Sequence, residues 1–271
     1  MSPWRPESRT RRSTALTLGL DLHGLAWLKD GDMGNAVARG SHQEGLAQAL
    51  ASAEPVRNVE IIAANDIALH WLQTAPSSVA SFGELRLVAG ARCALLFGGS
   101  PEDWWVTGDW KANQAFACAA LPMSVVTPLS QQLEQLRIRL HWHTVWGLIS
   151  RDLADAFPAD GWGAVRSAER VVLWHCRAGQ LNCLTAFHVG SAYSGEQTIE
   201  LARQQMLVQS SRDENAPAGI LTWFDLTGRD EFSSLPGICR IELPRPTAKT
   251  TAQSEAEMAL DLPCLLKRAL R

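Results

Sequence analysis

The chain has 271 residues, of which 46% are hydrophobic and 20% are charged, and this balance is typical of a globular protein with a large core. Its formal net charge is −3, so it lacks the concentrated positive charge that duplex nucleic acid requires, and we expect no nucleic-acid partner. No apolar run approaches the roughly 18–20 residues that cross a bilayer, so we expect no membrane-spanning helix.

Residues 1–14 are rich in arginine, and we expect them to form a basic disordered tail. Arg11 and Arg12 precede apolar residues, as in a twin-arginine export signal. Asp21 and His23 soon interrupt that apolar run, and no small-residue cleavage site follows, so we favour a solvated tail. The six cysteines form no C-x-x-C pair, which indicates reduced thiols and a cytoplasmic protein.

Strand and helix patterns alternate along the chain. The apolar spacing predicts strands over 15–21, 25–29, 35–41, 59–63, 67–73, 104–107, 115–120 and 138–149 in the first part. Helices are predicted between them over 43–53, 76–97, 124–136 and 150–157. After a loop over 158–163, the second part has predicted strands over 170–176, 181–189, 220–226 and 238–243, and a helix over 196–209.

A strand–strand–helix–strand order occurs in both parts, and each part opens with a hairpin, which indicates two α/β lobes. We therefore divide the chain into a basic disordered tail (1–14), a first α/β lobe (15–157), a second α/β lobe (158–245) and a linker with a C-terminal helix (246–271).

This organisation resembles the two-lobed actin-like (ribonuclease H-like) ATPase fold of sugar kinases, heat-shock chaperones and actin. More narrowly, it resembles the pilus-assembly and type II secretion branch of that fold. This branch holds the cytoplasmic actin-like protein of the type IV pilus inner-membrane platform and the cytoplasmic domain of the type II secretion L protein.

The resemblance points to three segments that would surround a nucleotide, and the first is GLDLHGLAW at 19–27. In active members an Asp at the strand end organises the metal, and a turn of small residues offers backbone N–H groups to the phosphates. Gly19 and Asp21 fit this pattern, and the turn continues to Gly24, but His23 stands where a small residue is expected. No hydroxyl residue lies between Asp21 and Trp27.

The second segment is the hairpin VVLWHCRAGQLNCLTAF at 171–187, where active members carry an Asp before a Gly. Gly179 matches the turn, but this stretch contains no acidic residue. The third segment, ILTWFDLTGRDEFSSLPG at 220–237, resembles the adenosine-binding turn through Thr227 and Gly228, although a second Gly is missing.

Phosphoryl transfer depends on positioning and on charge neutralisation, and losing one well-placed group commonly costs about 10²–10³ in rate. Several such groups are absent together, so the resemblance predicts a degenerate nucleotide site, no catalytic residue and no metal. It also predicts no cofactor, with ATP and Mg²⁺ disfavoured. Asp21, His23, Gly24, Gly179, Thr227 and Gly228 are then remnants of that site.

We therefore expect a non-catalytic cytoplasmic adaptor of a type IV pilus or type II secretion platform, peripheral at the inner membrane. The resemblance implies two partners: the cytoplasmic tail of a single-span inner-membrane protein and the assembly ATPase. The tail would lie extended in a groove between subdomains and would add to a sheet edge. An active kinase or ATPase of the same superfamily is the alternative, and a purely structural protein is a third hypothesis.

Two further patterns favour ordinary surface chemistry. His141 and His143 share one face of a predicted strand, as in a metal pair, but no third ligand is close in the sequence. Glu102, Asp103 and Asp109 surround two tryptophans, as carboxylates do in some glycosidases, but acidic turn residues of a hairpin are the simpler explanation.

Overall fold

The computed structural model describes residues 15–22, 24–28, 35–39, 41–53, 56–77, 79, 81–111, 114–152, 160–167, 169–190, 193–211, 221–225 and 238–241. The tail predicted over 1–14 and the linker and helix predicted over 246–271 lie outside these residues. Within the described part of the chain, no helix combines the length and apolar character that crossing a bilayer requires.

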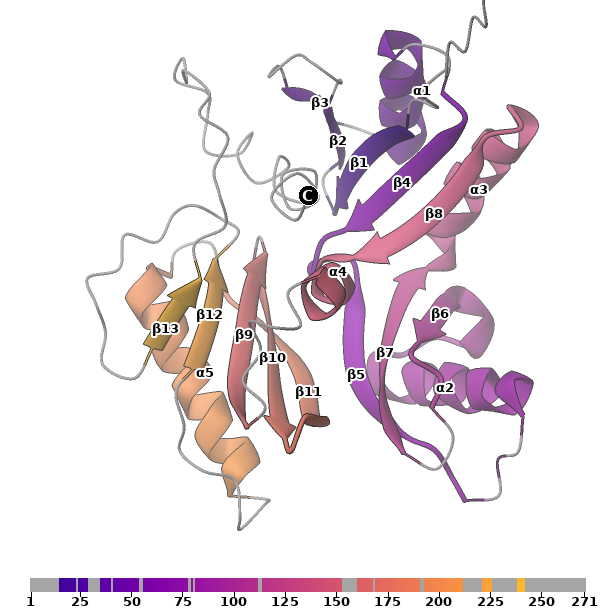
Figure 1. Ribbon diagram of the computed structural model, residues 1–271. Coiled ribbons are helices and arrows are strands. Elements are labelled where there is room, and N and C mark those ends of the chain that lie inside the picture. The colour runs from indigo at the N-terminus through magenta and orange to yellow at the C-terminus, as the bar shows by residue number, and fades with distance from the viewer. Residues whose placement is uncertain are drawn as a thin grey trace, which may run out of the picture.

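The first sheet has five strands in the order β3-β2-β1-β4-β8 (Figure 1). They are β1 (Ala15–Asp21), β2 (Gly24–Leu28), β3 (Asn35–Arg39), β4 (Asn58–Ala63) and β8 (Arg139–Thr144). β2 is antiparallel to both β1 and β3, whereas β1, β4 and β8 run parallel. Helices α1 (His42–Ser52) and α3 (Met123–Gln135) place Leu46, Leu129 and Leu133 in one buried cluster with Leu18 and Ile61 of the sheet.

A small three-stranded sheet is inserted between β4 and α3, in the order β5-β7-β6. It consists of β5 (Leu69–Thr74), β6 (Trp104–Gly108) and β7 (Ala115–Pro122), with helix α2 (Phe82–Phe97) and the short 3₁₀ helix η1 (Pro101–Asp103). Leu85, Ala89 and Cys93 on one face of α2 pack against Trp71 and Phe116, which is the helical spacing that the sequence predicts.

The second five-stranded sheet has the order β11-β10-β9-β12-β13. Its strands are β9 (Gly161–Ser167), β10 (Arg170–Arg177), β11 (Gln180–His188), β12 (Leu221–Asp225) and β13 (Ile238–Ile241), and it packs against α5 (Gly195–Ser210). β10 is antiparallel to β9 and β11, and β9, β12 and β13 are parallel. Both five-stranded sheets therefore place their strands in the order third, second, first, fourth, fifth, so the architecture is duplicated.

Helix α4 (Val145–Asp152) lies between the two halves (Figure 1). Val145, Trp146 and Ile149 form one buried cluster with Ile62 of β4 and Trp174 of β10. The sequence predicts a strand over 138–149, and that prediction is wrong beyond Thr144. The backbone N–H of Gly147 donates to the Thr144 hydroxyl at 3.0 Å, which caps the new helix.

The loop predicted over 158–163 is also partly wrong, because β9 begins at Gly161 and is buried along its length. Glycines normally indicate turns, but Gly163 has a packing role. A Cβ at this position would lie 2.2 Å from Cε2 of Trp174. The glycine is therefore required by the close approach of an indole ring and not by a turn.

Candidate functional site

Two carboxylates accept hydrogen bonds from backbone N–H groups of the turn between β1 and β2. The carboxylate of Asp21 is 2% exposed, and its Oδ1 accepts a hydrogen bond from the Gly24 N–H at 2.9 Å. The Leu22 N–H donates to Oδ2 of Asp66 at 3.2 Å. Two N–H groups that a phosphate-binding turn would offer to an anion are therefore bonded to carboxylates of this chain.

The neighbouring elements hold this turn in place. The Ala64 N–H donates to the Leu20 carbonyl at 2.8 Å, which carries the β1–β4 pairing to the end of both strands. On the other side, Nε2 of His42, the first residue of α1, lies 2.9 Å from the Asp21 carbonyl oxygen. Hydrogen bonds from the end of β4 and from α1 therefore hold the turn in place.

The carboxyl end of β4 also contacts the second sheet. Asn65 is fully buried, its N–H donates to the Ser167 hydroxyl and its side-chain amide donates to the Val165 carbonyl, both at 3.4 Å. Since Ser167 ends β9, the ends of β1, β4 and β9 meet at this point. We call Asp21, Asn65, Asp66 and Ser167 the junction. Ligands of open α/β sheets bind at such strand ends.

Gly179 is not brought to the junction. It lies in the β10–β11 turn with φ +72°, and the adjacent Ala178 N–H donates to Asp160. β10 pairs Cys176 with Gly161 and Arg170 with Ser167, so this turn lies beside the start of β9. β9 has 7 residues and so spans about 20 Å. Gly179 lies near its first residue and the junction at its last, so the two are separated by the length of this strand.

The duplicated strand order explains this difference. β9 is the counterpart of β1, so the hairpin that corresponds to β1–β2 is β9–β10 and not the β10–β11 hairpin that the sequence indicates. The corresponding strand end carries Ser167, where β1 carries Asp21.

Of the predicted site residues, Asp21 and Gly24 are brought together, while His23, Thr227 and Gly228 lie outside the described residues. The sequence-based prediction missed Asn65, Asp66 and Ser167. The signal for the first two was present, because this polar pair follows the apolar strand β4 after a single residue, Ala64.

The acidic cluster and the histidine pair that the sequence singled out are not part of the junction. The Asp103 carboxylate accepts from the Ser100 N–H at 2.7 Å, as an acidic turn residue does. His141 is exposed on β8 and His143 is half-buried, and no group of three or more metal-ligating side chains occurs within the described part of the chain.

A groove lies between the first sheet and the small sheet. It has a volume of about 610 Å³ and is lined by parts of β6, α3 and β8. Trp105 of β6 and Trp142 of β8 face it with ring centroids 6.1 Å apart, beside Leu140 and Met123. Among the described strands, β8 pairs only with β4, so the groove runs along a sheet edge.

Comparisons with known proteins identify the fold. No protein-family model matches the chain, and no curated protein matches its sequence. Among solved structures it is similar to the cytoplasmic domain of EpsL, an inner-membrane component of the type II secretion system of Vibrio cholerae. That match has 12% identity, covers 90% of this chain and 92% of the other, and has a TM-score of 0.46.

Two further structures are more similar in shape. A Bacteroides thetaiotaomicron protein with an actin-like ATPase fold and unknown function has 11% identity, with 79% and 81% of the two chains covered and a TM-score of 0.51. The PilM–PilN type IV pilus biogenesis complex has 10% identity, with 78% and 81% covered and a TM-score of 0.53. The chain has the actin-like ATPase fold, as the sequence resemblance predicts.

Proposed function

We propose that this chain is a non-catalytic cytoplasmic adaptor of a type IV pilus or type II secretion platform, peripheral at the inner membrane. The fold, which the chain has in common with the PilM–PilN complex, supports this assignment. The observation that carries it is the groove beside β8, because it combines an apolar floor with a sheet edge, the two features that an extended peptide needs.

In this proposal the occupant of the groove is the cytoplasmic tail of a single-span inner-membrane protein. The tail pairs its backbone with β8 and packs apolar side chains on Trp105, Trp142 and Leu140. Tryptophans in a partly enclosed groove are typical anchors of a protein interface. An assembly ATPase is the second partner in the proposal.

The bonded turn at the junction supports the non-catalytic part. A nucleotide would have to displace Asp66 from the Leu22 N–H and Asp21 from the Gly24 N–H, and its phosphates would then face both carboxylates. The alternative, an active kinase or ATPase of the same superfamily, requires that the Leu22 and Gly24 N–H groups bind the phosphates instead.

The groove can be tested with a synthetic peptide of the cytoplasmic tail of a candidate single-span inner-membrane protein. Leu140 lines the groove, whereas the adjacent His141 is exposed and does not. Leu140→Asp should weaken tail binding, measured by fluorescence anisotropy, by about tenfold or more, and the matched variant His141→Asp should leave it unchanged. Equal effects of both variants, or no binding by the unmodified chain, would overturn the proposal.

A further inference from the structure

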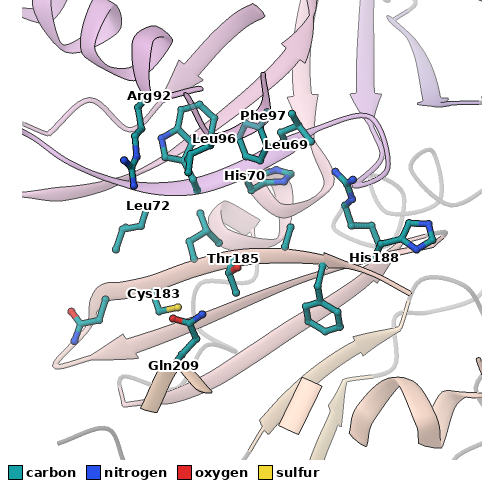
Figure 2. Close-up of a pocket in the computed structure, with 16 residues that line it drawn as sticks. Leu69, His70, Leu72, Arg92, Leu96, Phe97, Cys183, Thr185, His188 and Gln209 are labelled. Atoms are coloured by element: carbon teal, nitrogen blue, oxygen red, sulfur yellow. The ribbon is translucent and has the colours of Figure 1, made fainter. Parts of the chain in front are cut away.

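A second cavity lies on another side of the molecule, between β5, the end of α2 and β11 (Figure 2). Its volume is about 420 Å³. Figure 2 shows His70 and Leu72 on the side of β5 that faces β11, with Thr185 and Cys183 on the opposite wall. It shares no lining residue with the groove beside β8.

β11 presents a long backbone edge to this cavity. It has 9 residues and, among the described strands, it pairs only with β10. Its sequence QLNCLTAFH contains no residue with a permanent charge. Proteins usually protect such edges with charges, prolines or bulges, because an uncharged edge is a template for another strand.

The permanently charged residues that line the cavity are both basic. Arg92 and Arg170 line it, together with His70 and His188, and no Asp or Glu is among the lining residues. His188 has a partner at the rim, because its Nε2 lies 3.2 Å from the Glu169 carboxylate. The two arginines therefore favour a ligand that carries carboxylates.

His70 is a buried polar group. It is 2% exposed, its ring centroid lies 6.1 Å from that of the Trp146 ring, and neither ring nitrogen has a hydrogen-bond partner among the described residues. Burial, followed by the positive charge of Arg170, lowers its pKa to about 3, against the opposing effect of the Ala68 backbone. A neutral imidazole has one donor and one acceptor, and a ligand in the cavity would supply the missing partners.

The rim of the cavity is apolar at the end of α2. Leu96 and Phe97 line the cavity although 44% and 38% of their surfaces are exposed, and the adjacent Leu95 is 75% exposed. α2 ends here because Gly98 follows with φ +87°, so three apolar side chains are left in succession at the helix end. Exposed apolar residues grouped at a concave site indicate an interaction surface.

We propose that this cavity is a docking site for an extended acidic segment of a partner protein, which adds as a strand to the edge of β11. Its carboxylates pair with Arg92 and Arg170, and its apolar side chains cover Leu96 and Phe97. A second copy of this chain is a poor occupant, since β11 has no carboxylate and the same arginines would meet. This site is independent of the proposed function of the β8 groove.

The test uses a display library of random peptides about as long as β11, selected on the full chain. We expect the enriched peptides to alternate apolar and acidic residues. Arg92→Glu and Arg170→Glu should each weaken their binding by about tenfold, measured by anisotropy. The matched control is Arg86→Glu, because Arg86 is also an exposed arginine of α2 but does not line the cavity.

Hydrogen exchange locates the bound peptide. Slower exchange of backbone amides within 180–188 is the expected result. Enrichment of neutral or basic peptides, failure to enrich any peptide, equal effects of Arg86→Glu and Arg92→Glu, or protection elsewhere would each overturn the proposal. Sedimentation of the full chain adds one more outcome: a dimer that Arg170→Glu dissociates would show that a second copy covers β11 and would also overturn it.

Discussion

The carboxylate of Asp21 and the backbone N–H of Gly24 form a 2.9 Å hydrogen bond inside the β1–β2 turn. An aspartate at this strand end would be a metal-organising group in an active member of the fold. Here it stabilises the turn that follows it. We therefore expect substitutions of Asp21 to change the free energy of unfolding.

Asp21→Ala should lower the free energy of unfolding by about 1–3 kcal/mol, because it leaves the buried Gly24 N–H without a partner. Asp21→Asn keeps an acceptor oxygen and should cost less. Urea denaturation at neutral pH measures both. If the two variants were equally destabilised, the charge of Asp21, and not its hydrogen bond, would be the stabilising feature.

His70 should make the protein less stable in acid. Its folded-state pKa is lowered from 6.5 to about 3, so in this range the unfolded chain binds a proton that the folded chain does not. The stability is fully present above the unfolded pKa and is lost as the pH falls from 6.5 towards 3, by up to about 1.4 kcal/mol per pH unit.

Urea denaturation across this pH range measures the slope, and His70→Leu should reduce it. His188→Gln is the control, since the His188 side chain is 62% exposed. A slope that His70→Leu leaves intact would assign the acid sensitivity to other groups.

Gly163→Ala should destabilise the second sheet, because the new Cβ would meet the Trp174 ring, which is 1% exposed and enclosed by the core. Overpacking of this kind costs about 1–3 kcal/mol. Gly83→Ala in the first turn of α2 is the matched control, with only Ser81 Oγ at 4.0 Å. It should be neutral or stabilise by up to about 1 kcal/mol, and thermal unfolding compares the two.

Cys93 and Cys118 should resist alkylation in the folded protein. Burial raises the pKa of each thiol to about 12, so almost no thiolate is present at pH 8. Mass spectrometry after iodoacetamide treatment should find both unmodified without denaturant and modified in urea. Rapid native labelling of either thiol would contradict the buried packing under α2.

Much of the fold follows from local pattern. Short apolar runs predict β1, β4 and β10, and the spacing of Leu85, Ala89 and Cys93 predicts the buried face of α2. α2 begins later than its apolar spacing indicates, because Ser81 and Glu84 form a capping box. Helix and strand patterns are ambiguous for short apolar runs, which explains why the first part of α4, up to Ile149, is predicted as strand.

The candidate site was harder to predict because it depends on sheet order. Gly163 indicates a loop by type, so β9 is missed, and without β9 the β10–β11 hairpin takes the place of the true counterpart of β1–β2. The contacts of Asn65 with Ser167 join residues 102 positions apart. No local pattern contains that information.

The Leu22 and Gly24 N–H groups of the β1–β2 turn are bonded to carboxylates of this chain, and we propose that the turn holds no nucleotide. Isothermal titration calorimetry of the full chain with Mg-ATP tests it most directly. We expect no saturable heat of binding and no ATP hydrolysis above background. Saturable binding, with ATP and Mg²⁺ located against Asp21 and Gly24 in a crystal structure, would contradict it.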